Sequence, residues 1–298
     1  MKKPYFFAAI SVLCWSTVAT IVKLLLGELT SMQVLCLSSL FAFSFLLIFN
    51  LATGNIKKLR AYRPRDYLLT VLIGLPGTFL YYVFYYSGTA RLPASEAFII
   101  NYLWPIMSVI FAILLLRERV TARKLVAILL SFLGVVIAMA RDLLRFDTDA
   151  MLGALFCVLG AISYGVFTAL NQKTHYDKRI SMMFFYFVTF LLTLTITLSS
   201  GGFPSLRPIQ IAGFAFNGIF TMAIANTMWM LALEGAHNTA RVSNLAYLTP
   251  FLSLLWTTLF LKEEFHILSL VGLSVIVGGI LIQNYKGHKD RPKIKTKS

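Results

Sequence analysis

Polar and aromatic side chains recur at helical spacing inside the apolar stretches of this sequence. One face of the fourth stretch carries three of them together with a proline, at i, i+3, i+4 and i+7, namely Asn101, Trp104, Pro105 and Ser108. Proline has no backbone N–H, so the carbonyl of Asn101 loses its helical donor. An amide, an indole, a hydroxyl and a free carbonyl on one face suit the binding of a small molecule.

The same pattern returns 145 residues later without a gap. Residues 102–105 (YLWP) correspond to 247–250 (YLTP), and 116–118 (LRE) correspond to 261–263 (LKE). A free carbonyl at membrane depth is tolerated where it faces protein or water, so a helix broken at Pro105 and at Pro250 predicts a central site. A plain kink is the alternative, because proline is common in membrane helices.

The two copies differ where a ligand would touch them. Ala246, Thr249 and Ser253 stand at the positions of Asn101, Trp104 and Ser108. These differences indicate substrate specificity. The alternative is that Trp104 only packs and that Asn101 only satisfies the freed backbone.

Composition places the chain in the bilayer, with 58% hydrophobic residues and a mean hydropathy of +0.77. The fold class expected is all-α integral membrane, with ten transmembrane helices. Each predicted stretch can cross the hydrocarbon core or nearly so. The ten stretches are 6–26, 32–52, 67–87, 94–116, 125–141, 151–171, 182–199, 210–233, 239–261 and 267–285.

Five spans per copy is an odd number, so the second copy enters the membrane from the opposite face. The sequence therefore predicts two inverted five-helix repeats, 1–141 and 150–285, followed by a basic tail, 286–298. Inverted repeats suit alternating access. Lys and Arg concentrate in the loops on the side of both termini, which predicts cytoplasmic termini in the plasma membrane. The net charge of +15 thus indicates topology and anionic lipid rather than nucleic acid.

Two other helices carry candidate binding residues. Ser16, Thr20 and Lys23 form a polar stripe beside Trp15, with Lys23 close enough to the end of its span to snorkel to the interface. Tyr164 occupies the position of Trp15 in the second copy. The third span carries an aromatic cluster that predicts either a cavity wall or an interfacial belt, made of Thr78, Tyr81, Tyr82, Tyr85 and Tyr86.

Residues for catalysis or metal binding do not assemble. Cys14, Cys36 and Cys157 lie in apolar spans without CxxC spacing, and the histidines are scattered. Glu96 lies in the first turn of its span, where a carboxylate caps a helix. Paired acids, HExxH and a Ser/His couple at membrane depth are absent from the sequence. We therefore expect no enzyme, metal or cofactor.

These features resemble the EamA family of the drug/metabolite transporter superfamily across nearly the whole chain. Residues 14–17 (CWST) and 101–105 (NYLWP) further resemble the bacterial aromatic amino-acid exporter branch. That resemblance implies a ten-helix carrier in which Trp15 and Trp104 line a central cavity.

The predicted function is export of amino acids, aromatic or bulky and apolar, or of similar small metabolites by alternating access. The alternatives are export of amphipathic metabolites or drug-like cations, and a passive channel. The chain holds both copies, so we expect a functional monomer. The expected substrate-binding residues are Trp15, Ser16, Thr20, Thr78, Tyr81, Tyr82, Asn101, Trp104, Ser108, Tyr164, Thr249 and Ser253, with helix breaks at Pro105 and Pro250.

Overall fold

The computed structural model of the chain describes residues 3–140, 147–172, 174, 176–236, 242, 244–264 and 266–284. The predicted tail 286–298 and the boundary residues Arg141 and Tyr285 lie outside these ranges. Across the described ranges the chain is helical and has no strand. The prediction of an all-α membrane protein is confirmed.

Eight helical segments are long and apolar enough to cross a membrane. In the first half they are α1 (Lys3–Ser16) with α2 (Val18–Leu26), α3 (Ser31–Ala52), α4 (Pro64–Gly74) with η2 (Leu75–Leu80) and α5 (Tyr81–Arg91), and α6 (Ala94–Asn101) with α7 (Trp104–Leu116). In the second half they are α10 (Thr148–Gln172), α11 (Lys178–Ser199), α12 (Pro208–Ala215) with η3 (Phe216–Ile224) and α13 (Ala225–Glu234), and η4 (Asn244–Leu248) with α15 (Thr249–Trp256) and η5 (Thr257–Leu261). A short helix, η1 (Asn55–Ala61), precedes α4.

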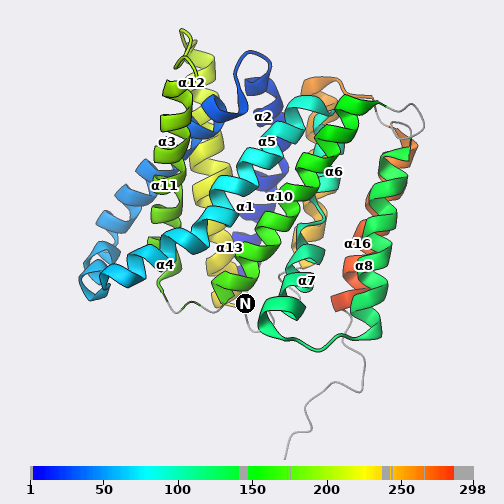
Figure 1. Cartoon of the computed structure of the whole chain (residues 1–298), viewed down its shortest axis with the longest axis horizontal. Helices are drawn as coiled ribbons and strands as arrows, with labels where there is room; N and C mark the ends of the chain where they lie inside the picture. Colours follow the sequence, from blue (N-terminus) through cyan, green and yellow to red (C-terminus); the bar gives the residue numbers. More distant parts are fainter. Residues whose placement is uncertain are drawn as a thin grey trace, which may run out of the picture.

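Two further apolar helices are shorter and pack against each other at one side of the molecule (Figure 1). They are α8 (Ala122–Ala138) and α16 (Ile267–Asn284), whose apolar part is Ile267–Ile282. The backbones approach closely at Gly134 and Gly272, where an added Cβ would lie 2.6 Å and 2.4 Å from the carbonyl oxygen of the other glycine. Small residues permit such close packing of membrane helices.

The remaining helices pair in a regular way. On the side opposite α8 and α16, α3 lies along α11 (Figure 1). Between these pairs, α1 packs against α13 and α15, and α10 packs against α5 and α7. The offset between the halves is 149 residues from α1 to α10, 145 from α7 to α15, and 144 from α5 to α13, as it is from Pro64 to Pro208 at the starts of α4 and α12. Exchange of the halves therefore leaves this set of contacts unchanged.

In the described part of the chain an interruption of the α-helix precedes each of the two prolines. α6 ends at Asn101 and α7 begins at Trp104, with Pro105 as its second residue. In the second half a tight 3-10 turn, η4, leads to α15, where Pro250 is again the second residue. Proline is favoured in the first turn of a helix because the N–H groups there have no helical acceptor.

Four other interruptions occur in the described part of the chain and were not predicted, one at Thr17 and three π-helical segments, η2, η3 and η5. The helix pair α1–α2 breaks at Thr17, where the hydroxyls of Ser16 and Thr17 donate to the carbonyls of Leu13 and Cys14. Such bonds compete with the helical ladder and bend helices. The third and eighth predicted spans each widen into a π-helix, η2 and η3, a feature that frequently marks functional sites.

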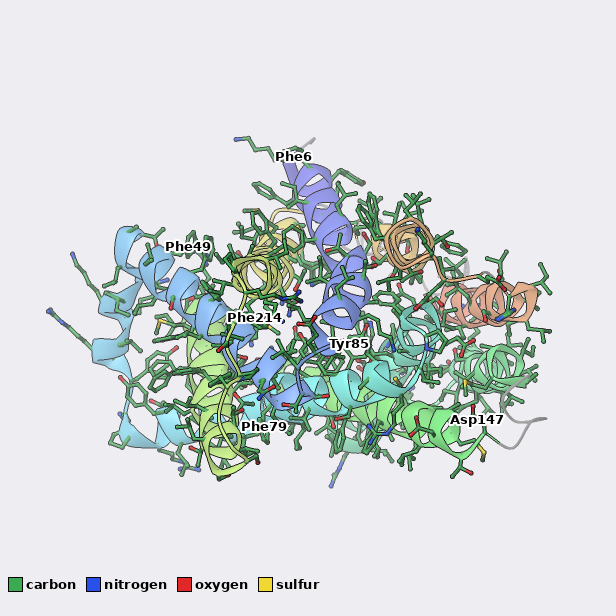
Figure 2. The ribbon with its side chains drawn as sticks, turned by 90° about the horizontal axis from the view of Figure 1, so that it is seen from above. Phe6, Phe49, Phe79, Tyr85, Asp147 and Phe214 are labelled. Carbon is green, nitrogen blue, oxygen red and sulfur yellow. The ribbon has the colours of Figure 1, made fainter. Side chains whose placement is uncertain are left out.

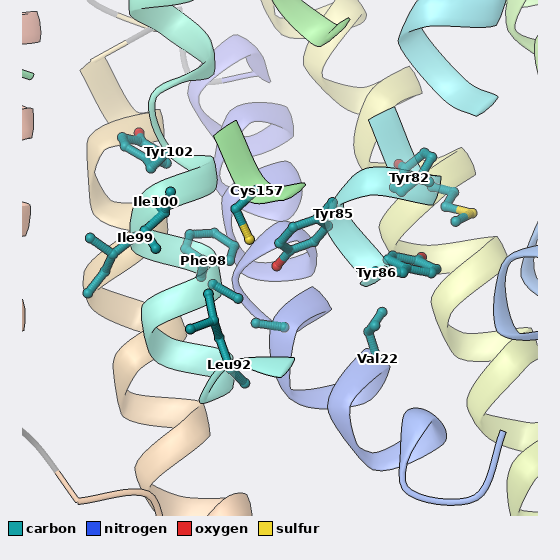
Figure 3. Close-up of a cluster of buried hydrophobic side chains, with 14 of the residues drawn as sticks. Val22, Tyr82, Tyr85, Tyr86, Leu92, Phe98, Ile99, Ile100, Tyr102 and Cys157 are labelled. Carbon is teal, nitrogen blue, oxygen red and sulfur yellow. The ribbon is translucent and has the colours of Figure 1, made fainter. Parts of the chain in front are cut away.

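The core is built around tyrosines rather than aliphatic side chains alone. Tyr85 and Tyr86 are fully buried, and Tyr85 lies near the centre of the bundle in the end-on view (Figure 2). Figure 3 shows Tyr85 between Cys157 and the pair Tyr82 and Tyr86. The interfacial-belt interpretation of the third span is therefore wrong for these rings, because they face the interior.

Candidate functional site

A central cavity of about 830 Å³, including its part open to solvent, lies where the interrupted helices meet. Aromatic rings dominate its wall, and none of the lining side chains is charged. The lining residues are Trp15, Val18, Gly77, Thr78, Tyr81, Tyr82, Phe98, Asn101, Tyr102, Trp104, Tyr164, Phe167, Met182, Tyr186, Thr221, Asn226, Ala246 and Thr249.

Eight of the twelve predicted binding residues lie in this wall, and four do not. Ser16 accepts a hydrogen bond from the indole N–H of Trp256 at 2.8 Å. Ser108 donates to the carbonyl of Trp104 at 2.9 Å, inside its own helix. Thr20 and Ser253 are buried, and their hydroxyls have no hydrogen-bond partner. The binding roles of all twelve stay predictions.

Each half of the chain supplies the cavity wall from corresponding positions. Five pairs line it together, Trp15 with Tyr164, Val18 with Phe167, Gly77 with Thr221, Tyr82 with Asn226, and Trp104 with Thr249. Asn101 and Ala246 form a sixth pair. Paired positions on both sides place the cavity between the two halves.

Asn101 presents an unsatisfied oxygen at the helix break. Its side-chain Nδ2 donates to the hydroxyl of Tyr81 at 3.0 Å, whereas its Oδ1 is buried without a partner. The hydroxyl of Thr249, also in the cavity wall, is likewise buried and unpartnered. A buried polar group without a hydrogen bond is costly, so these two atoms are suited to meet polar groups of a ligand.

The freed carbonyl of the second copy is satisfied by a side chain of the first. Tyr102 donates its hydroxyl to the carbonyl of Ala246 at 2.8 Å. Ala246 is the residue whose helical donor Pro250 removes. The break in one half is thus stabilised by the residue that follows the break in the other half.

The break in the first copy has a different arrangement. The backbone bonds across it run from Tyr102 to Phe98 and Ile99, and from Leu103 to Ile100. None of these bonds reaches the carbonyl of Asn101, whose donor Pro105 lacks. This carbonyl belongs to a residue of the cavity wall.

The aromatic rings of the wall contact one another edge to face or tilted. Trp104 meets Tyr164 with ring centres 5.2 Å apart, and Tyr164 meets Tyr81 at 4.9 Å. Trp15 packs instead on Trp229, at 5.3 Å. Such contacts fix ring orientation and leave flat faces for an apolar ligand.

Sequence reasoning missed several residues of the wall. Phe98 lies one turn before Asn101 on α6, and Tyr186 and Asn226 come from α11 and α13. Asn226 donates to the hydroxyl of Tyr186 at 3.3 Å and to the carbonyl of Met222 at 2.5 Å. The correspondence of Asn226 with Tyr82 between the two halves is the signal that could have found it.

A second cavity, with about 490 Å³ of empty space including its part open to solvent, lies at the end of the bundle where α2 ends and α6 begins, here called the far end. It is opposite the N-terminus in Figure 1. Lys23 donates to the carbonyls of Thr89 and Leu92, a contact that the sequence did not predict. Glu96 lies in the first turn of α6, as the sequence indicates, and the carboxylate of Glu263 accepts hydrogen bonds from the first N–H groups of that helix.

No group of three or more His, Cys, Asp or Glu side chains arranged to hold a metal occurs in the described part of the chain. The fold and the uncharged aromatic cavity define a multi-pass membrane protein with an internal small-molecule cavity.

Sequence comparison then identifies the family. The EamA-like transporter family matches residues 2–140 and again residues 151–285. The chain belongs to this family, and it is a membrane transporter. The family therefore matches the chain twice, once in each half.

Individual relatives cover most of the chain. An uncharacterized transporter of Archaeoglobus fulgidus is 23% identical over 97% of this chain and 99% of its own length. The uncharacterized transporter YvbV of Bacillus subtilis is 27% identical over 81% and 79%. The uncharacterized inner membrane transporter YhbE of Escherichia coli is 24% identical over 76% and 74%. A solved crystal structure, 21% identical, matches with a TM-score of 0.69 over 94% of this chain and 96% of the other, which supports the fold alone.

Proposed function

We propose that this protein exports amino acids, aromatic or bulky and apolar, or closely similar metabolites by alternating access. The observation that carries the proposal is the composition of the central cavity. Aromatic rings surround it, none of the described lining side chains is charged, and two residues of the wall, Asn101 and Thr249, carry buried side-chain oxygens without a hydrogen-bond partner in the described part of the chain.

This chemistry favours a molecule with an apolar ring and a compact polar end. The rings of Trp104 and Tyr164 would stack on the apolar part, and Asn101 Oδ1 would accept a hydrogen bond from an ammonium group. A zwitterion brings both of its charges and so needs no compensating charge from the protein. A permanent cation lacks such balance and would depend on cation–π contacts alone.

The proposal includes ten spans in two inverted repeats, 1–141 and 150–285. It is supported by the exchange symmetry of the helix pairs, by the twin π-helices and by the paired positions in the cavity wall. The basic loops support a cytoplasmic location for the end of the bundle opposite the far end, here called the near end, where both termini are proposed to lie. One chain then forms the whole cavity and works as a monomer.

Counterflow tests the function directly. Purified protein in liposomes preloaded with unlabelled tryptophan should accumulate labelled tryptophan, and phenylalanine should compete better than threonine or a quaternary amine. Competition by the quaternary amine alone would favour a cation carrier. Absence of counterflow in folded protein would contradict the aromatic substrate, and currents far above carrier turnover would establish a channel.

A further inference from the structure

The two cavities share a wall, and α6 forms one side of it. Phe98 and Asn101 of α6 line the central cavity, whereas Ser95 and Glu96, about one turn earlier, line the far-end cavity. Between the two sets lies Ala97, which is fully buried. The barrier between the cavities is therefore thin along α6.

The other side of the barrier is the ninth predicted span, η4–α15–η5. Thr249 lines the central cavity, and Thr257, two turns further along the same face, lines the far-end cavity. Ser253 lies between them, fully buried, and its hydroxyl has no partner. A buried hydroxyl without a partner indicates a surface that becomes wet in another conformation, because burial without a hydrogen bond is costly.

At the far end a carboxylate of the ninth predicted span makes hydrogen bonds to α6. Glu263, which follows η5, accepts hydrogen bonds from the backbone N–H of Ala94 through Oε1 at 2.6 Å and of Ser95 through Oε2 at 3.0 Å. These are the first N–H groups of α6, where the helix dipole favours a negative charge. Both oxygens of the carboxylate are used in this contact.

The turn between α5 and α6 is also held from the opposite side. Lys23 donates to the carbonyls of Thr89 at 2.8 Å and Leu92 at 2.5 Å, at the C-terminus of α5, where a cation is favoured. The ammonium group of Lys23 and the carboxylate of Glu263 also attract each other. A cation from α2 and an anion from the ninth span thus hold one helix turn.

We propose that the route from the central cavity to the far end runs between α6 and the ninth span, and that Glu263 is the latch that closes it. Separation of α6 from η5 joins the two cavities into one passage, with Ser253 in its wall. This inference rests on the proposed transport function. Non-α segments on both sides of α15, namely η4 and η5, provide places where that helix bends.

The experiment measures access to the central cavity without any substrate. Cys14, Cys36 and Cys157 are replaced, and Thr249→Cys supplies one thiol in the cavity wall. A membrane-impermeant maleimide is added from either face of vesicles, and Ser205→Cys, in the exposed loop before α12 at the far end, reports which face is exposed.

Glu263→Gln should open the far end. The glutamine replaces one acceptor oxygen by an NH₂ donor that faces a backbone N–H. We expect labelling from the far end to rise roughly tenfold, the change that follows loss of one charge-assisted hydrogen bond. Labelling from the near end should fall.

A second variant keeps the result interpretable if Glu263→Gln folds poorly. Ala94→Pro removes the donor of the 2.6 Å bond and leaves Glu263 intact. Proline fits the first helical position, and the preceding residue, Pro93, is already extended with ψ 142°. The same rise in labelling is expected.

Glu118→Gln is the matched control. Glu118 occupies the corresponding position in the first half, but it pairs with Lys124 at the near end, 2.8 Å away. It should leave far-end labelling unchanged. Unchanged labelling in both Glu263→Gln and Ala94→Pro, or an equal rise from both faces, would overturn the latch. Loss of tryptophan counterflow would affect the substrate assignment only.

Discussion

The two halves of the chain share parts of their backbone geometry but carry different side chains at the cavity. Both halves interrupt a helix before a proline, and both end the following segment at a left-handed residue, Arg117 with φ 56° and Lys262 with φ 55°. In the cavity wall, however, Trp104 of the first half corresponds to Thr249 of the second.

The first half supplies most of the ring surface, and the second half supplies smaller groups. Trp104, Tyr82 and Asn101 correspond to Thr249, Asn226 and Ala246. A symmetric cavity would present the same groups at both ends of a ligand. The difference makes the two sides of the cavity unlike each other, which suits an asymmetric molecule.

The largest expected effect compares Trp104 with its counterpart. Trp104→Ala should lower the initial rate of tryptophan counterflow by about tenfold or more, because a buried aromatic contact is worth about 1.5–3 kcal/mol. Thr249→Ala should lower it by about threefold at most, as expected for one hydrogen bond. Equal losses would contradict the division of roles between the halves.

A second comparison tests the bond that joins the two breaks. Tyr102→Phe leaves the carbonyl of Ala246 buried without a donor and should lower the free energy of unfolding by about 1–3 kcal/mol. Pro250→Ala in the same protein restores an N–H to that carbonyl and should recover part of the loss. Thermal unfolding in detergent measures both.

The matched control for that pair is Pro105→Ala. In the Tyr102→Phe background its new N–H faces the carbonyl of Asn101 and should recover nothing. Equal recovery by both proline variants would show that the effect comes from general helix straightening rather than from the Ala246 carbonyl.

Corresponding glycines provide a third comparison, of tolerance to one added methyl group. A Cβ on Gly218 would lie 2.2 Å from the backbone oxygen of Ser38, whereas one on Gly74 would lie 2.2 Å from the ring of Phe185. A ring can turn aside and a packed backbone cannot. Gly218→Ala should therefore reduce stability by about 1–3 kcal/mol more than Gly74→Ala. Equal melting temperatures for the two variants would show that the backbone of α3 shifts as easily as the ring of Phe185.

The smallest effect concerns an ion pair that joins the halves at the near end, Lys58 with Asp177. Partial burial alone raises the pKa of Asp177, but the Lys58 ammonium and the N–H of Arg179 outweigh it and lower that pKa below its usual value. The stabilisation is present above the usual pKa and is lost as pH falls through the lower one. Because Lys58 is half exposed, it amounts to about 0.2–1 kcal/mol. Asp177→Asn should reduce the acid dependence of the melting temperature, and an unchanged acid profile would contradict the pair's contribution.

The sequence predicted the helix breaks because proline acts locally. Pro105 and Pro250 each remove one donor wherever they stand, and the repeat of 145 residues pointed to both. Of the tyrosines of the third span, Tyr81 and Tyr82 lie in the cavity wall, whereas Tyr85 and Tyr86 are buried outside the lining. Their spacing in the sequence did not by itself separate a wall from an interfacial belt.

The remaining features depend on partners far away in the chain. Lys23 turns inward because the carbonyls of Thr89 and Leu92 lie within reach, and Glu263 reaches Ala94 across 169 residues. The π-helices η2 and η3 likewise pack against helices from distant parts of the chain, η2 against α10 and α11 and η3 against α3. No local pattern contains this information, so Phe98 and Tyr186 were also missed.

The pairing of α8 with α16 sets an order for assembly of the protein during its synthesis. α8 leaves the ribosome near the middle of the chain, but its main packing partner, α16, is the last helix in the described part of the chain. Until α16 is made, Gly134 lacks the backbone against which it packs closely. A chain cut before Ile267 therefore leaves α8 without its main contact, and we expect it to be less stable than the full chain.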